Sequence, residues 1–125
     1  MFFVFFLVFS WQFQHIDKVS ARTTIRLWHE MHILRKIPHD FISLFEPNIE
    51  GLYVAAVRHG EIKSIALCSS IDTRILTICN IAHAPEEFYA ACKLIELANT
   101  RGIKSDWNKL KSQPRWFCEQ IYQTK

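Results

Sequence analysis

Among the residues of this 125-residue chain, the histidines have the spacing that is most similar to a known catalytic or metal-binding motif. His29 and His32 lie three positions apart, with Glu30 between them. The zinc pattern of metalloproteases instead needs two histidines four positions apart on one helical face, with the glutamate as base. The nearest further ligands are His39 and Asp40. We therefore interpret these histidines as surface or half-buried side chains, and the sequence predicts no metal site.

His59 and His83 each follow an apolar stretch that is typical of a strand, and loops at strand ends often carry catalytic groups. A histidine there can act as a general base near neutral pH. The sequence contains no Gly-x-Ser-x-Gly nucleophile motif and no glycine-rich phosphate loop, since its three glycines lie at 51, 60 and 102. Catalytic residues thus stay unknown, and a structural role is the ordinary interpretation of both histidines.

The cysteines, at 68, 79, 92 and 118, include no Cys-x-x-Cys pair of the kind found in zinc sites. Each one falls in an apolar segment, where cysteine behaves as a small hydrophobic residue. We expect reduced core cysteines, with a cross-strand Cys68–Cys79 disulfide as the alternative.

The stretch from Gly51 to Gly102 contains His59 and His83 and would therefore position a site built on them. Its first part predicts a three-strand meander. Apolar and β-branched residues predict the strands Leu52–Val57, Glu61–Cys68 and Arg74–Ala82. His59-Gly60 suits a tight hairpin because glycine readily takes a positive φ. A polar turn is expected between the second and third strands, at Ser69, Ser70, Asp72 and Thr73.

The best-marked element is a helix that begins at Pro85 and ends before Gly102. Proline suits the first helical position, and Glu86 and Glu87 favour the positive end of the helix dipole. Gly102 suits a left-handed cap. Apolar residues at three- and four-residue spacing predict one buried face: Phe88, Ala91, Cys92, Leu94, Ile95 and Ala98.

The flanking segments complete an α+β fold, with a small mixed or antiparallel sheet packed by helices. Asp17 suits the N-cap of an amphipathic helix that ends near Ile37, before Pro38. Shorter elements are expected at Phe41–Phe45 (helix), Ile103-Lys104 (strand), Asp106–Lys111 (helix, with Ser105 as N-cap) and Arg115–Tyr122 (helix). We expect a single domain over 1–125, with a core at 17–104 and a helical tail at 105–125.

The apolar start of the chain has several interpretations. Alternation from Phe9, with Trp11 and Phe13 on the same face, predicts an N-terminal strand within 1–16. A leader or membrane anchor is the alternative, although the apolar run is shorter than the about 20 residues that span a bilayer. A signal peptide would also carry an early basic residue, and none precedes Lys18. The third interpretation is that these residues precede the true translation start of the protein.

Composition narrows the classes of partner. The net charge is +3, and the basic residues are scattered, which does not indicate a nucleic acid. Aromatic residues gather at the two ends of the chain and favour a protein partner or an oligomer there. We expect a cytoplasmic protein, with membrane association through residues 1–13 or secretion as alternatives.

The order of these elements resembles that of the GNAT-type N-acetyltransferases. The segments that carry the resemblance have the sequence EGLYVAAVRHGEIKSIALCSS…RILTICNIAHAPEEF…KLIELANTRGIKS. The resemblance covers about Asp17 to Lys104. It implies acetyl-CoA as a cofactor, with Ile81 and His83 at the strand positions whose backbone holds the pantetheine arm. The family's Arg/Gln-x-x-Gly-x-Gly/Ala loop, which binds the pyrophosphate, is replaced by Pro85-Glu86-Glu87-Phe88-Tyr89-Ala90-Ala91, with two carboxylates and no glycine.

Three functions remain open at this point. The first is a GNAT-like acyltransferase-type domain, active or catalytically degenerate. The second is a small non-enzymatic interaction module that uses its aromatic terminal segments. The third is a secreted or membrane-tethered small protein.

Overall fold

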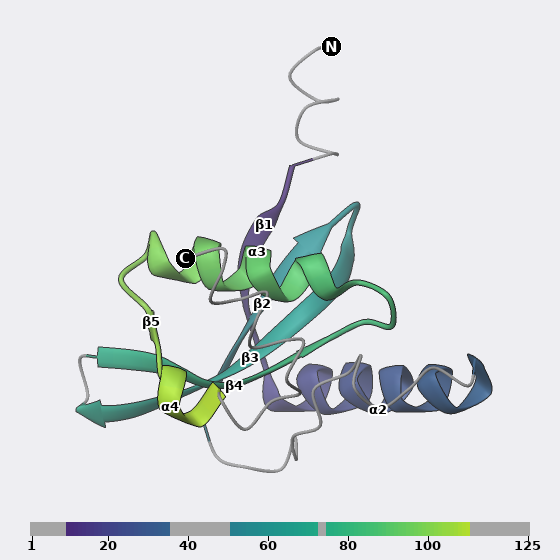
Figure 1. The fold of residues 1–125 in the computed structure, drawn as a ribbon, viewed down its shortest axis with the longest axis horizontal. Helices are drawn as coiled ribbons and strands as arrows, with labels where there is room; N and C mark the ends of the chain where they lie inside the picture. The colour runs from purple at the N-terminus through teal and green to yellow at the C-terminus, as the bar shows by residue number, and fades with distance from the viewer. Residues whose placement is uncertain (1–9, 36–50, 73–74, 111–125) are drawn as a thin grey trace.

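The computed structural model describes residues 10–35, 51–72 and 75–110, which build a five-stranded sheet with a helix on each face (Figure 1). The strands follow one another across the sheet in chain order: β1 (Gln12–Ile16), β2 (Leu52–Arg58), β3 (Glu61–Asp72), β4 (Ile75–His83) and β5 (Lys104–Ser105). Neighbouring strands are antiparallel except for the parallel pair β4–β5. The expected α+β class with a mixed sheet is confirmed.

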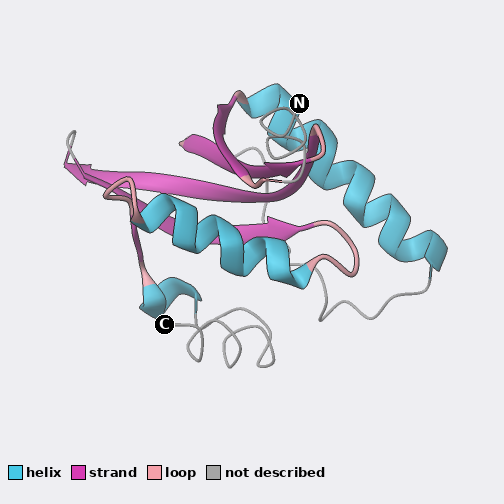
Figure 2. Ribbon diagram, turned by 90° about the horizontal axis from the view of Figure 1, so that it is seen from above, coloured by secondary structure: helices cyan, strands magenta, loops and turns pink. Residues whose placement is uncertain are grey.

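Two helices cover opposite faces of this sheet. Helix α2 (Lys18–Arg35) lies on one face and α3 (Phe88–Asn99) on the other, as the two perpendicular views show, and the short α4 (Trp107–Leu110) follows β5 (Figures 1 and 2). The core is accordingly split by the sheet into two clusters of buried residues. The α2 cluster centres on Ile25, Trp28 and Tyr53, and the α3 cluster on Ile81 and Leu94.

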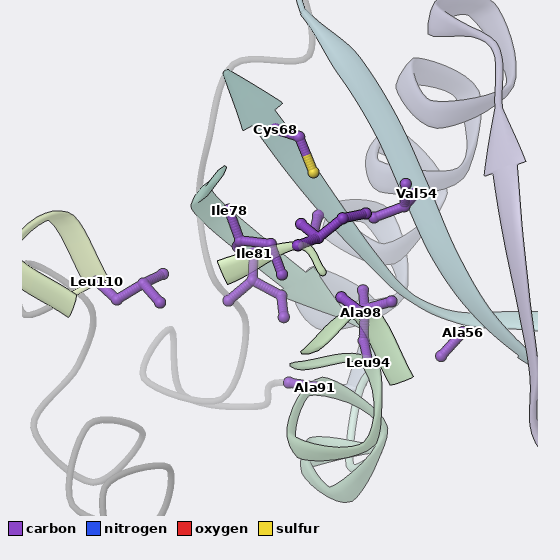
Figure 3. Packing of buried hydrophobic residues seen from close by; sticks show 11 residues of the cluster. Val54, Ala56, Cys68, Ile78, Ile81, Ala91, Leu94, Ala98 and Leu110 are labelled. Carbon is purple, nitrogen blue, oxygen red and sulfur yellow. The ribbon is translucent and has the colours of Figure 1, made fainter. Parts of the chain in front are cut away.

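The side chains of β2 alternate between the two covered faces of the sheet, which explains why its sequence is a continuous apolar run. Val54 and Ala56 belong to the α3 cluster, whereas Tyr53, Ala55 and Val57 belong to the α2 cluster. A strand with both faces covered needs apolar residues at every position. Figure 3 shows Val54, Ile78, Ile81 and Leu94 gathered between the sheet and α3.

The β2–β3 hairpin closes through His59 (φ 55°) and Gly60 (φ 75°). Positive φ at both central residues is the arrangement of a type I′ turn, which matches the twist of the flanking strands. The predicted tight turn is confirmed.

The predicted turn after the second strand is wrong for most of its residues. Strand β3 continues to Asp72, and Ser69, Ser70 and Asp72 pair with Thr77, Leu76 and Ile75 of β4. Pairing with a partner strand satisfies the backbone of a polar segment as well as that of an apolar one, so composition placed the turn too early. Of the turn residues, only Thr73 lies outside the described residues.

Helix α3 begins at Phe88 rather than at Pro85. Glu86 has φ 65°, a left-handed conformation that cannot continue into a right-handed helix, and the Glu87 N–H bonds back to the Ala84 carbonyl at 3.0 Å. The predicted buried face is confirmed at Ala91, Leu94 and Ala98, which are fully buried, and the predicted left-handed Gly102 has φ 80°.

Helix α2 and strand β1 confirm two predictions about the first part of the chain. The Asp17 carboxylate caps α2, since it accepts bonds from the Ser20 backbone N–H at 2.7 Å and the Ser20 hydroxyl at 2.9 Å. These bonds lower the pKa of Asp17. The strand expected within 1–16 is present as β1, which pairs with β2 along its whole length.

The remaining short elements differ from expectation by small shifts. The strand predicted at Ile103-Lys104 is β5, Lys104–Ser105. The cap of the following helix is Asp106 rather than Ser105, because Asp106 Oδ1 accepts the Lys109 N–H at 3.2 Å. The helices predicted at Phe41–Phe45 and Arg115–Tyr122, the helix ends at Ile37 and Lys111, and the apolar residues 1–9 lie outside the described residues. No helix in the described ranges has the length and apolar character needed to cross a membrane.

Candidate functional site at the end of β4

His83 is the last residue of β4 and is completely buried on the α3 face of the sheet. Its ring meets that of Phe88 edge-on, with centroids 5.9 Å apart. Nδ1 lies 2.8 Å from the Ala84 carbonyl oxygen. Because a carbonyl can only accept, Nδ1 carries the proton of the neutral ring.

Burial lowers the pKa of His83 from 6.5 to about 4 because it disfavours the charged imidazolium, while the hydrogen bond to the Ala84 carbonyl acts in the opposite direction. The ring is therefore neutral at neutral pH. This arrangement matches the structural interpretation of His83 rather than that of a solvent-facing base. His59, the other histidine considered, is exposed in the β2–β3 turn.

Ser64 lies directly opposite His83 on β3 and is also completely buried. Its hydroxyl donates to the Ala90 carbonyl of α3 at 2.7 Å, which attaches the sheet to the first turn of that helix. The sequence analysis missed this residue. A small polar residue two positions before Ala66, on the face that α3 covers, is the signal that could have identified a close contact between strand and helix.

Lys63 links β3 to the turn that precedes α3. Its ammonium lies 2.9 Å from a Glu61 carboxylate oxygen and 3.6 Å from one of Glu87, and its carbonyl accepts the Ala84 N–H at 2.9 Å. The bond to Glu61 raises the pKa of Lys63, and Lys63 lowers the pKa of Glu61. Lys63 therefore offsets the charge of Glu87, one of the two carboxylates at the start of α3.

The backbone of β4 presents donors along its outer edge. Since the Ala84 N–H bonds to Lys63, the opposed residues Ser64 and His83 form a non-hydrogen-bonded pair of the antiparallel ladder. The N–H groups of His83 and, two residues earlier, Ile81 consequently point away from β3. The two positions that the family resemblance singled out thus share one edge and one buried face.

Two features border this edge. The Ile81 N–H lies 3.2 Å from the side-chain oxygen of Asn80, which acts as an internal acceptor. Strand β5 pairs with β4 only at Thr77 and Ile78, and the chain then turns into α4 after the Asp106 N–H bonds to the Ile78 carbonyl at 2.8 Å. A backbone edge with outward donors can bind an extended ligand that supplies acceptors.

The other candidate chemistry is not brought together. Across residues 10–35, 51–72 and 75–110, no group of three or more His, Cys, Asp or Glu side chains is arranged to hold a metal ion. Cys68 packs in the α3 cluster and Cys79 against the α2 cluster, and both are free thiols. The alternative of a Cys68–Cys79 disulfide is wrong, because the two side chains lie on opposite faces of the sheet. Burial raises the pKa of Cys68 to about 12, so its thiol stays protonated and is a poor nucleophile.

Comparison with known proteins yields no match: no family model fits the chain, and no curated protein or solved structure is significantly similar to it.

Proposed function

We propose that this chain is a GNAT-like acyltransferase-type domain that binds acetyl-CoA along the outer edge of β4. The observation that carries the proposal is the outward direction of the Ile81 and His83 N–H groups. The amide carbonyls of a pantetheine arm are acceptors that such an edge can bind. The limited pairing of β4 with β5 supports the same site, because it leaves this part of β4 beyond the reach of the β5 ladder.

The start of α3 argues for a weakened, catalytically degenerate form of this activity. A helix N-terminus favours a pyrophosphate, and the N-cap residue of this helix, Glu87, makes no capping bond with its own side chain. Glu86 is exposed and has a left-handed φ of 65°, and the Glu87 carboxylate lies 3.6 Å from the ammonium of Lys63. Without glycines for close backbone approach, we expect the pantetheine arm to contribute more to binding than the pyrophosphate does.

Thermal unfolding of the full chain with and without acetyl-CoA tests the proposal. A ligand at 100 times its dissociation constant adds about 2.7 kcal/mol to the free energy of unfolding. We expect a higher melting temperature with acetyl-CoA and a smaller rise with pantetheine alone, which lacks the nucleotide and therefore reports on the β4 edge.

An Asn80→Ala variant provides the specific test. Removing the side-chain oxygen that occupies the Ile81 N–H should increase the shift produced by pantetheine and by acetyl-CoA, relative to the variant alone. Asn108→Ala is the matched control, because Asn108 is an exposed amide on α4, and it should leave the shift unchanged. If neither wild type nor Asn80→Ala responds to acetyl-CoA, the proposal is wrong.

A further inference from the structure

The surface between β1 and α3 brings together aromatic rings from distant parts of the sequence. Trp11 and Phe13 are half-buried against the α3 cluster. The ring of Tyr89, on the first turn of α3 and 61% exposed, lies 6.3 Å from that of Trp11 between centroids. Further along β1, the rings of Phe13 and the exposed His15 meet edge-on, with centroids 5.5 Å apart. We call these four side chains the ring row.

A guanidinium lies over each of the two central rings of the row. Cζ of Arg58 is 5.4 Å from the centroid of the Trp11 ring, and Cζ of Arg101 is 4.6 Å from that of Phe13. Neither arginine forms an ion pair with any residue that the structure describes. Two neighbouring units therefore each combine a flat aromatic surface with a positive charge that no carboxylate neutralises.

Arg58 is held over Trp11 although its donors are not used. Its Nε is buried and has no hydrogen-bond partner in the described part of the chain. The carboxylate opposite it in the hairpin, that of Glu61, lies instead 2.9 Å from the Lys63 ammonium. A guanidinium that is fixed beside a ring, with its hydrogen bonds unmade, is suited to a phosphate, whose geometry it matches.

We propose that the ring row and its two arginines bind single-stranded nucleic acid. Proteins of this kind stack successive bases on aromatic side chains or on guanidinium planes, and use arginine and lysine to contact the phosphates. Trp11 and Phe13 are two residues apart on one face of the chain, which separates them by about 7 Å and allows each to stack a different base.

The repetition of the unit favours a polymer as the ligand. One ring with one guanidinium occurs at Trp11 and again at Phe13, and a nucleic acid repeats base and phosphate in the same way. A single nucleotide would use only one of the two units. A duplex keeps its bases stacked against one another, so it would leave the rings without a partner. The fold thus gathers cations that are scattered along the sequence.

Fluorescence anisotropy of a labelled oligouridylate of about 12 nucleotides, titrated with the full chain, tests the proposal. The wild type should bind at low salt. The logarithm of its binding constant should fall with the logarithm of the salt concentration, with a slope of about −1.4 for two phosphate contacts. A duplex of the same length and uridine monophosphate should both bind more weakly.

Two variants locate the binding surface. Tyr89→Ala removes an exposed ring and should weaken binding about tenfold. Arg58→Gln should also weaken binding and should make the salt slope shallower by about 0.7. Arg26→Gln is the matched control, because it removes the same charge from an exposed position on α2, on the opposite face of the sheet, and it should change neither quantity.

Circular dichroism of each variant verifies that the fold is intact. The proposal is overturned by a wild type that does not bind at low salt, or by an Arg26→Gln variant that weakens binding as much as Arg58→Gln does. A duplex or uridine monophosphate that binds as tightly as the single strand would also overturn it. The assay contains no acetyl-CoA, so its outcome is separate from that of the proposed function.

Discussion

The two edges of the sheet share one feature, outward backbone donors, and differ in everything that surrounds them. At the β1 edge the pairing is regular, the strand is uncharged and most of its side chains are exposed. At the β4 edge the register shifts opposite Cys68, the side chains of Ile81 and His83 are completely buried, and the start of α3 lies next to the last residue of the strand. The comparison suggests that outward donors alone do not define a site, whereas an edge beside a helix start suits a small extended ligand.

The largest expected effect is a loss of stability, and it should differ between the β4 edge and the β1 edge because their side chains contribute differently to the core. Ile81→Ala removes a completely buried side chain from the α3 cluster and should lower the free energy of unfolding by about 3 kcal/mol. Phe13→Ala removes a half-buried ring from β1 and should cost clearly less. Urea denaturation measures both. Equal losses would mean that the β1 edge is as much a part of the core as β4.

The second effect concerns pH at the β4 edge. The pKa of His83 falls from 6.5 in the unfolded chain to about 4 in the folded protein, so the unfolded chain binds more protons between these values. The stabilisation from the neutral ring is complete above pH 6.5 and is lost as the pH falls toward 4. It amounts to about 3 kcal/mol at most.

Chemical denaturation at a series of pH values measures this loss, with His83→Phe as the comparison. The variant should have a flatter profile between pH 4 and 6.5, because it has no group to titrate at this position. An unchanged slope would show that other groups cause the pH dependence.

The smallest expected effect is a gain in stability at the turn before α3. Glu86 has a left-handed φ of 65°, which a side chain makes unfavourable by about 1 kcal/mol. Glu86→Gly should therefore raise the free energy of unfolding by about that amount, and it removes a carboxylate near the proposed pyrophosphate position. Thermal melting measures the gain, and acetyl-CoA should then produce a larger shift than in wild type. A loss of stability would mean that the Glu86 side chain contributes more than its strained backbone costs.

The elements whose signals lie close together in the sequence were predicted well. The His59-Gly60 turn, the Asp17 cap, strand β2 and the buried face of α3 each depend on a few neighbouring residues, because turn chemistry, capping and periodicity are local properties. The order of elements and the α+β class followed from these local signals.

Other features depended on residues far apart in the chain. The extension of β3 to Asp72 required its partner β4, and the burial of His83 required α3 and the Ser64–Ala90 bond from β3. The direction of the donors on β1 and β4 depends on ladder register across the whole sheet. Sequence alone thus determined the type and approximate position of these strands and helices, because each carries its own local signal. Tertiary structure alone decided which backbone groups face outward and which side chains are buried from solvent, because both properties follow from pairing and packing between distant segments.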